Sequence, residues 1–169
     1  QGSGMSVWEL PFGDPRFQQM VDRARQDLRE LLAIPDHFLI LFMQGGASAQ
    51  FSLLPMNLLG HAGHAQDAPH ADHAQHVDYV ETGHWSCKAI REARRYCRVN
   101  VVASGASSGF TEIPSVSSWQ LDSSAAYCHI TSNETAEGLQ FSEMPDTGDV
   151  PLVVDMTSDF LSRPIDFQR

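Results

Sequence analysis

Asp155 is a candidate ligand-binding residue, because its position in the sequence suits a carboxylate at the end of a buried strand. It follows a short apolar run, Pro151-Leu152-Val153-Val154, and polar residues come after it. Such a run predicts a buried parallel strand. Asp155 would then lie at the carboxyl end of the strand, the edge where open α/β sheets bind ligands. Because a lone buried carboxylate is costly, it must face a cation, hydrogen-bond donors or water. The alternative is that Asp155 only caps a following helix.

A second candidate site is the turn Gln44-Gly45-Gly46-Ala47-Ser48, which joins an expected strand at residues 38–43 to an expected helix at residues 49–59. A glycine turn that opens a helix leaves backbone N–H groups free. These groups and the helix dipole both favour an anion such as phosphate. The pattern alone is only suggestive, because two glycines serve any tight strand-to-helix turn.

Two more candidates follow expected strands. Trp85 lies in the turn 82–86, between a strand at residues 77–80 and a helix at residues 87–97. It is either a core residue whose indole N–H needs a partner or a flat platform for an aromatic ligand. Thr135 follows a strand at residues 126–131 and bonds either neighbouring backbone groups or a ligand.

The elements that must position these residues alternate between strand and helix patterns. Further strands are expected at residues 99–103 and 152–154. A helix is expected from Asp14-Pro15 to about Leu32, with an apolar stripe that faces the core. This alternation predicts an α/β fold: a three-layer αβα arrangement around a mostly parallel sheet, whose strand order is not sequential at the ligand edge.

Composition argues against several classes of protein. The 169 residues can form one modest core, and 42% hydrophobic with 19% charged residues indicates a globular protein rather than a disordered or membrane one. The net charge of −10 argues against a nucleic-acid partner. Neither a signal peptide nor a membrane-spanning run is expected. Three cysteines without metal-ligand spacing, Cys87, Cys97 and Cys128, predict free thiols in a reducing cytoplasm.

A histidine-rich insertion, HAGHAQDAPHADHAQH, occupies residues 61–76. Its histidines are His61, His64, His70, His73 and His76. Imidazole is a common metal ligand, and spacings of three place side chains on one helical face. A solvated loop without metal is favoured, because low-complexity tracts of this kind rarely pack a core.

Five segments, in order, resemble one known family. They are LFMQGGASAQFSLLPMNLLG at 41–60, DYVETGHWSCKAI at 78–90, VNVVAS at 99–104, HITSNET at 129–135, and DTGDVPLVVDM at 146–156 with SDFLSRPID after it. Together they are similar to the phosphoserine aminotransferases, pyridoxal-phosphate enzymes of fold-type I. The resemblance covers nearly the whole chain. It implies that residues 1–169 are part of a cofactor-binding large domain.

The resemblance also implies roles for the candidate residues. The backbone of Ala47 and Ser48 would hold the cofactor phosphate, and Trp85 would stack on the pyridine ring. Thr135 would hydrogen-bond the cofactor, and Asp155 would pair with the protonated ring nitrogen. The implied substrates are phosphoserine and 2-oxoglutarate or glutamate, and the implied assembly is a cytoplasmic homodimer without nucleic-acid or membrane partners.

Two features depart from the family pattern. The only lysine, Lys88, is expected on the outer face of a helix, whereas the family's Schiff-base lysine follows in a GAQKN-like sequence expected beyond Arg169. No catalytic residue is therefore assigned in this chain. After SVWE at residues 6–9, Pro11-Phe12-Gly13 replaces the family's Ser-His-Arg. Two alternatives follow: a fold-type I aminotransferase with another amino donor, or a fragment or subunit that cannot catalyse.

Overall fold

The computed structural model describes residues 4–59 and 76–167, and the chain forms two units. One contains residues 1–42 and 161–169, and the other contains residues 43–160. The histidines from His61 to His73 lie outside the described residues. His76 lies inside them as the first residue of a strand, so it does not belong to the expected loop.

Helix α1 (Pro15–Leu31) is the main element of the first unit, after the short 3-10 helix η1 (Val7–Glu9). Asp14 caps α1 by accepting a 2.8 Å hydrogen bond from the Arg16 N–H, and Pro15 occupies the first turn. The helix predicted at these residues is confirmed. Its apolar stripe is not buried within the described residues, since Leu31 is 72% exposed and no side chain of α1 is fully covered.

The prediction of a strand at residues 38–43 is wrong. These residues run without strand pairing, and Leu39 and Leu41 are 82% and 67% exposed. An apolar run has the composition of a strand, but a strand exists only where a neighbouring strand accepts its backbone hydrogen bonds. The described residues offer none here.

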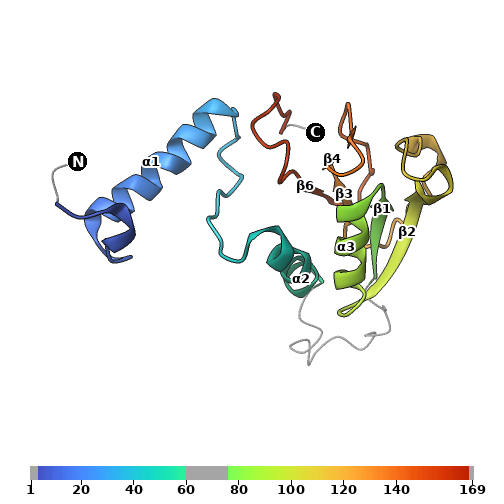
Figure 1. The fold of residues 1–169 in the computed structure, drawn as a ribbon, viewed down its shortest axis with the longest axis horizontal. Coiled ribbons are helices and arrows are strands. Elements are labelled where there is room, and N and C mark those ends of the chain that lie inside the picture. The colour runs from blue at the N-terminus through green and yellow to red at the C-terminus, as the bar shows by residue number, and fades with distance from the viewer. Residues whose placement is uncertain (1–3, 60–75, 168–169) are drawn as a thin grey trace. The chain divides into compact units, whose positions relative to one another are not determined.

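The second unit is an α/β arrangement, which confirms the predicted parallel sheet with flanking helices (Figure 1). Its helices are α2 (Gly46–Leu58) and α3 (His84–Ala93), with 3-10 helices η2 (Ala106–Ser108) and η3 (Val116–Ser118). The four strands of its sheet are β1 (His76–Glu81), β2 (Arg98–Ser104), β3 (Cys128–Thr131) and β6 (Leu152–Asp155). A small antiparallel pair, β4 (Asn133–Glu134) and β5 (Leu139–Gln140), lies between β3 and β6 in sequence.

All neighbouring strands of the four-stranded sheet are parallel, in the order β2-β1-β3-β6. The order is not sequential, as predicted. The chain moves outward in one direction from β1 to β2 and in the other from β3 to β6, so the order reverses between β1 and β3. Ligands of open α/β sheets bind at such a reversal, outside the carboxyl ends of the strands. The register places Thr131 beside Asp155 at that end.

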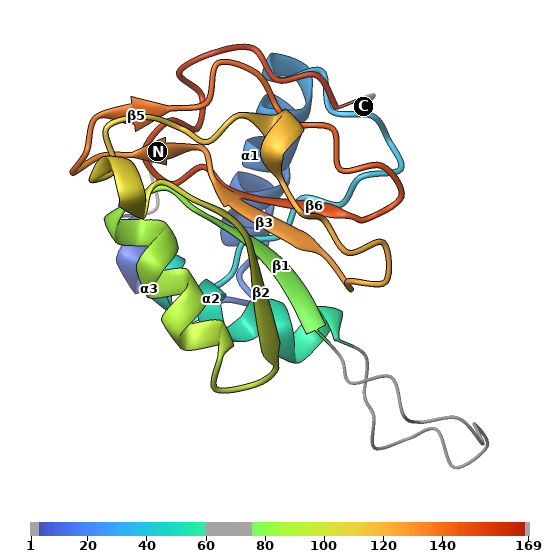
Figure 2. The same cartoon turned by 90° about the vertical axis from the view of Figure 1, so that its right-hand side faces the viewer.

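Helices α2 and α3 lie together along one face of this sheet (Figure 2). The core beneath them joins Phe51 of α2, Ile90 of α3 and Tyr79 of β1 with further buried side chains. On the other face a second cluster includes Ile130 of β3 and Phe141. Full burial of one such side chain contributes about 1.5–3 kcal/mol to stability, so these clusters hold the strands on which the site is built.

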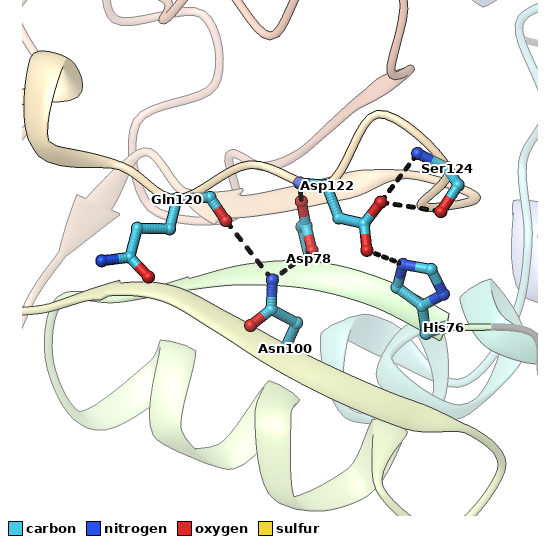
Figure 3. Close-up of polar contacts among 6 residues, drawn as sticks. All are labelled: His76, Asp78, Asn100, Gln120, Asp122 and Ser124. Carbon is cyan, nitrogen blue, oxygen red and sulfur yellow. Dashed lines mark hydrogen bonds and ion pairs between the residues drawn. The ribbon is translucent and has the colours of Figure 1, made fainter.

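Hydrogen bonds of polar side chains connect the segment after η3, residues 119–124, to strands β1 and β2 of the sheet (Figure 3). Asp78 of β1 is fully buried, and its carboxylate accepts hydrogen bonds of 2.9 Å from Asn100 Nδ2 and 2.8 Å from the Asp122 N–H. Asp122 in turn lies 2.9 Å from Nε2 of His76, the residue that begins β1. A buried carboxylate is tolerated because these donors satisfy it.

Candidate active site

The five residues predicted to bind a cofactor line one pocket of about 240 Å³. It lies at the carboxyl ends of β3 and β6, beside the first turns of α2 and α3. Its lining comprises Gly45, Gly46, Ala47, Ser48, Trp85, Thr131, Asn133, Thr135, Asp155, Thr157 and Ser158. The topology thus brings together residues that are up to 113 positions apart in sequence, from Gly45 to Ser158.

The first turn of α2 forms one wall of the pocket. Gly45 precedes the helix with φ +97°, and a Cβ there would lie 2.3 Å from Ala49 Cβ, so this position requires glycine. No side chain caps the helix. The first-turn N–H groups of Gly46, Ala47 and Ser48 have no intrahelical partner and are available to an anion. Helix α2 begins three residues before its predicted start, which places Ala47 and Ser48 inside this turn.

Trp85 forms a second wall, from the first turn of α3. This helix also begins three residues earlier than predicted. The half-buried indole of Trp85 has the His84 ring edge-on at 5.0 Å and the Lys88 ammonium 4.7 Å from a ring centroid. Lys88 does not line the pocket, which fits its expected position on the outer face of the helix.

Asp155 is the last residue of β6, as predicted. Its Oδ1 accepts hydrogen bonds from the N–H and the hydroxyl of Thr157, at 3.0 and 2.5 Å. The capping alternative is therefore only partly right, because Asp155 caps a turn and not a helix. Oδ2 has no hydrogen-bond partner among the described residues, and the carboxylate borders the pocket.

Thr135 is exposed at the turn that joins β4 to β5, and it lines the pocket with Asn133. Thr131, the last residue of β3, was not among the residues predicted for the site. Thr131 is 2% exposed, and its Oγ1 has no hydrogen-bond partner within the described part of the chain. Its position at the carboxyl end of a predicted strand was the available signal. A buried hydroxyl without a partner at a pocket wall is suited to bond a ligand.

His129 lies deeper on β3, on a neighbouring cavity of about 310 Å³ that Asp155 and Ala47 also border. Its side chain is fully buried, and burial lowers its pKa from 6.5 to about 4, while the Asp155 carboxylate acts in the opposite direction. Neither ring nitrogen has a hydrogen-bond partner among the described residues. Sequence reasoning missed this residue, because its burial comes from distant side chains.

The described lining of the pocket offers an anion backbone donors rather than cationic side chains. Neither lysine nor arginine is among its described lining residues, so the amides and dipole of α2 are the groups that attract an anion. No cluster of three or more His, Cys, Asp or Glu suited to a metal occurs within residues 4–59 and 76–167. Among the helices described for this chain, none is long and apolar enough to cross a membrane.

Among protein families, the class-V aminotransferase model matches residues 13–169 of this chain. Phosphoserine aminotransferase from Ectopseudomonas mendocina is 52% identical over 169 residues, 100% of this chain and 44% of the relative. The enzyme of that name from Chromobacterium violaceum is 48% identical over 169 residues, 99% of this chain and 43% of the relative.

Solved structures agree in fold. Phosphoserine aminotransferase from Bacillus circulans subsp. alkalophilus matches with a TM-score of 0.87 and 42% identity, over 98% of this chain and 43% of that one. The pyridoxal-phosphate-bound phosphoserine aminotransferase from Trichomonas vaginalis matches with a TM-score of 0.83 and 38% identity, over 99% and 44% of the two chains. The chain spans less than half the length of these relatives.

Proposed function

Because this chain belongs to the class-V aminotransferase family, we propose that it is the cofactor-binding part of a phosphoserine aminotransferase. The complete enzyme would use pyridoxal phosphate to transfer an amino group between phosphoserine and 2-oxoglutarate. Residues 1–169 would form part of its large domain. The observation that carries this proposal is the meeting of an open helix N-terminus, an aromatic ring and a carboxylate in one pocket.

The pocket residues fit the three parts of pyridoxal phosphate. The phosphate is an anion, and the uncapped first turn of α2 offers backbone donors through Ala47 and Ser48. The pyridine ring is flat and aromatic, like the indole of Trp85. The ring nitrogen is basic, and Asp155 supplies a carboxylate.

Bound pyridoxal phosphate supplies an electron sink for the carbanion formed at the substrate Cα. Asp155 would hold a proton on the ring nitrogen by pairing with it, because a carboxylate favours the charged form of a nearby base. Trp85 would pack against one face of the ring and exclude water from that face. Thr135 would fix the polar edge of the ring through its hydroxyl.

The amine nucleophile of the complete enzyme is not assigned to Lys88. Lys88 is exposed, and its ammonium contacts the indole of Trp85 rather than lining the pocket. We therefore expect residues 1–169 alone to bind the cofactor weakly and to show no transamination. A borohydride-reducible adduct that maps to Lys88, with turnover of phosphoserine, would contradict this assignment.

Binding of pyridoxal phosphate to the chain, measured by absorbance and tryptophan quenching, tests the phosphate site. Pyridoxal without phosphate is the matched ligand, and we expect it to bind at least about tenfold more weakly. Ala47→Pro removes one first-turn N–H at a position where proline is tolerated, and should weaken only the phosphorylated ligand. Ser48→Ala keeps every N–H and is the control. Equal affinity for both ligands would refute the phosphate assignment.

The amino donor can be tested in a protein of the relatives' full length that contains this chain. Pro11-Phe12-Gly13 offers no cationic side chain. The nearby Arg16 donates to both carboxylate oxygens of Asp14, at 3.0 and 2.7 Å, and lowers the pKa of that carboxyl to about 2. Arg16 is therefore already paired. We expect turnover of phosphoserine in preference to aspartate and alanine; a preference for either of those donors would favour another fold-type I aminotransferase.

We further propose a cytoplasmic homodimer without nucleic-acid or membrane partners. The three cysteines, which the structure describes as free, support a reducing compartment. Burial raises the pKa of Cys87 to about 11, with a further contribution from Glu81, and that of Cys128 to about 12, so both thiols resist oxidation. The net charge of −10 disfavours nucleic acid. Light scattering on the full-length protein tests the dimer.

A further inference from the structure

The N-terminus of α3 meets two carboxylates that come from the segment after β3. Glu134 Oε2 accepts a 2.8 Å hydrogen bond from the Trp85 N–H. Glu134 Oε1 accepts a 2.8 Å bond from the Ser86 N–H and a 3.3 Å bond from the Thr82 hydroxyl. Glu137 Oε1 accepts a 2.9 Å bond from the His84 N–H. The first turn of α3 is thus satisfied by side chains about 50 residues away.

The Glu134 side chain is buried, only 1% exposed, so its carboxylate depends on protein donors rather than on water. A buried carboxylate is tolerated only with several donors, and the first turn of a helix supplies N–H groups that otherwise have no partner. The Glu134 carboxylate therefore supplies acceptors to the first-turn N–H groups of α3, and these N–H groups offset the cost of burying the carboxylate. The helix dipole adds to the attraction, because its N-terminus favours negative charge.

Gly83 makes room for the two carboxylates. A Cβ at this position would lie 2.6 Å from Glu137 Cδ and Oε2 and 2.9 Å from Glu134 Cδ. A side chain here would have to displace the carboxyl ends of both glutamates, so glycine allows this close approach. The reason is not its φ of 167°, which is ordinary extended backbone.

We propose that Glu134 is a positioning residue that sets the place of Trp85 in the pocket. Glu134 binds the N–H of Trp85 directly, and it immediately precedes Thr135, another lining residue. The buried carboxylate of Glu134 thus connects α3, which carries Trp85, to the β4–β5 turn, which carries Thr135. This inference rests on the proposed function, in which the indole and the threonine hydroxyl contact one cofactor.

The variant Glu134→Gln tests this role. An amide keeps the size of the side chain, but one of its two ends becomes a donor facing the N–H groups of α3. Glu137→Gln is the matched control at the same helix end, because it changes the partner of His84 alone. The chain is labelled with 5-fluorotryptophan, and the ¹⁹F resonances of Trp8, Trp85 and Trp119 are assigned by Trp→Phe substitution.

We expect Glu134→Gln to shift or broaden the Trp85 resonance of the ligand-free chain while the Trp119 resonance stays unchanged. Affinity for pyridoxal phosphate should fall about tenfold, within the range expected for a buried polar group left without its partner. Glu137→Gln should change that affinity less than about twofold, because its carboxylate binds neither Trp85 nor Ser86. An unmoved Trp85 resonance, or equal effects of the two variants, would overturn the proposal.

Glu134→Asp keeps the charge and covers the case in which Glu134→Gln unfolds the chain. We expect its Trp85 resonance to move while Trp119 again stays in place, since the carboxylate is retained one methylene farther back. Collapse of all three resonances in both variants would show a purely structural role and overturn the proposal. If the parent chain does not bind pyridoxal phosphate, the proposed function fails, whereas the ligand-free ¹⁹F signals still decide whether Glu134 positions Trp85.

Discussion

Acid should destabilise this chain through His129. The imidazole is fully buried, stacks on Tyr79 with ring centroids 4.6 Å apart, and meets the Phe51 ring edge-on at 6.5 Å. Neither nitrogen has a hydrogen-bond partner among the described residues. Charge on such a ring is disfavoured, and desolvation lowers its pKa to about 4, although the Asp155 carboxylate partly opposes this.

The sign and size of the effect follow from the two pKa values. The unfolded chain takes up a proton at His129 near pH 6.5, whereas the folded chain does so only near pH 4. Folding stability from this group is therefore complete above pH 6.5, falls as the pH drops through this window, and is lost below about 4. A difference of about 2.5 in pKa, at about 1.4 kcal/mol for each pKa unit, gives a total loss of about 3.5 kcal/mol.

Urea unfolding followed by circular dichroism at pH 7.5, 6.5, 5.5 and 4.5 measures this loss. His129→Leu removes the titrating group, and His37→Gln, at an exposed histidine, is the control. We expect the parent and His37→Gln to lose about 2–3 kcal/mol more than His129→Leu between pH 7.5 and 4.5. Parallel stability curves for the parent and His129→Leu would refute the reasoning, because acid loss would then come from other groups.

Three further substitutions have defined outcomes. Asp155→Asn, in a full-length protein containing this chain, should lower turnover by about 100-fold or more and change cofactor affinity much less. The reason is that an amide cannot stabilise a protonated ring nitrogen as a carboxylate does. Equal turnover of the two proteins would remove Asp155 from the mechanism. Gly83→Ala should cost about 1–3 kcal/mol in thermal unfolding through overpacking, whereas Gly13→Ala, with nothing within 4 Å of the added Cβ, should be near neutral. Asp78→Ala should cost about 3 kcal/mol in urea unfolding, because it leaves the Asp122 N–H unpaired and leaves Asn100 Nδ2 only its longer 3.4 Å bond to the Gln120 carbonyl; a loss below about 1 kcal/mol would show that water replaces the lost acceptor.

The sequence was sufficient to predict the edge of the sheet that carries the site. A short apolar run followed by a polar residue marks the carboxyl end of a buried parallel strand, and this local signal placed Asp155 correctly. Parallel strands align these ends, so the residues after β1 and β3 had to lie nearby. The roles of Ala47, Ser48 and Trp85 stay predictions, although the structure places all three on the pocket.

Residues 38–43 show that an apolar pattern alone does not suffice to predict a strand. Their run of apolar side chains is as strand-like as that of β6, yet they form no ladder among the described residues and Leu39 is 82% exposed. Composition reports the surroundings that a segment prefers, whereas a strand also needs a neighbour in register. His129 was missed for the same reason, because its burial depends on Tyr79 and Phe51 from other elements.

The clearest limit of sequence reasoning concerns the two helix N-termini beside the pocket. Both α2 and α3 begin at a glycine turn, and either turn would bind an anion by local pattern alone. The structure shows that Glu134, 48 residues beyond Ser86, accepts a hydrogen bond from the Ser86 N–H. A protein carboxylate therefore occupies the first turn of α3, whereas no side chain caps the first turn of α2. That difference is made by a contact distant in sequence, so it becomes visible only in the folded chain.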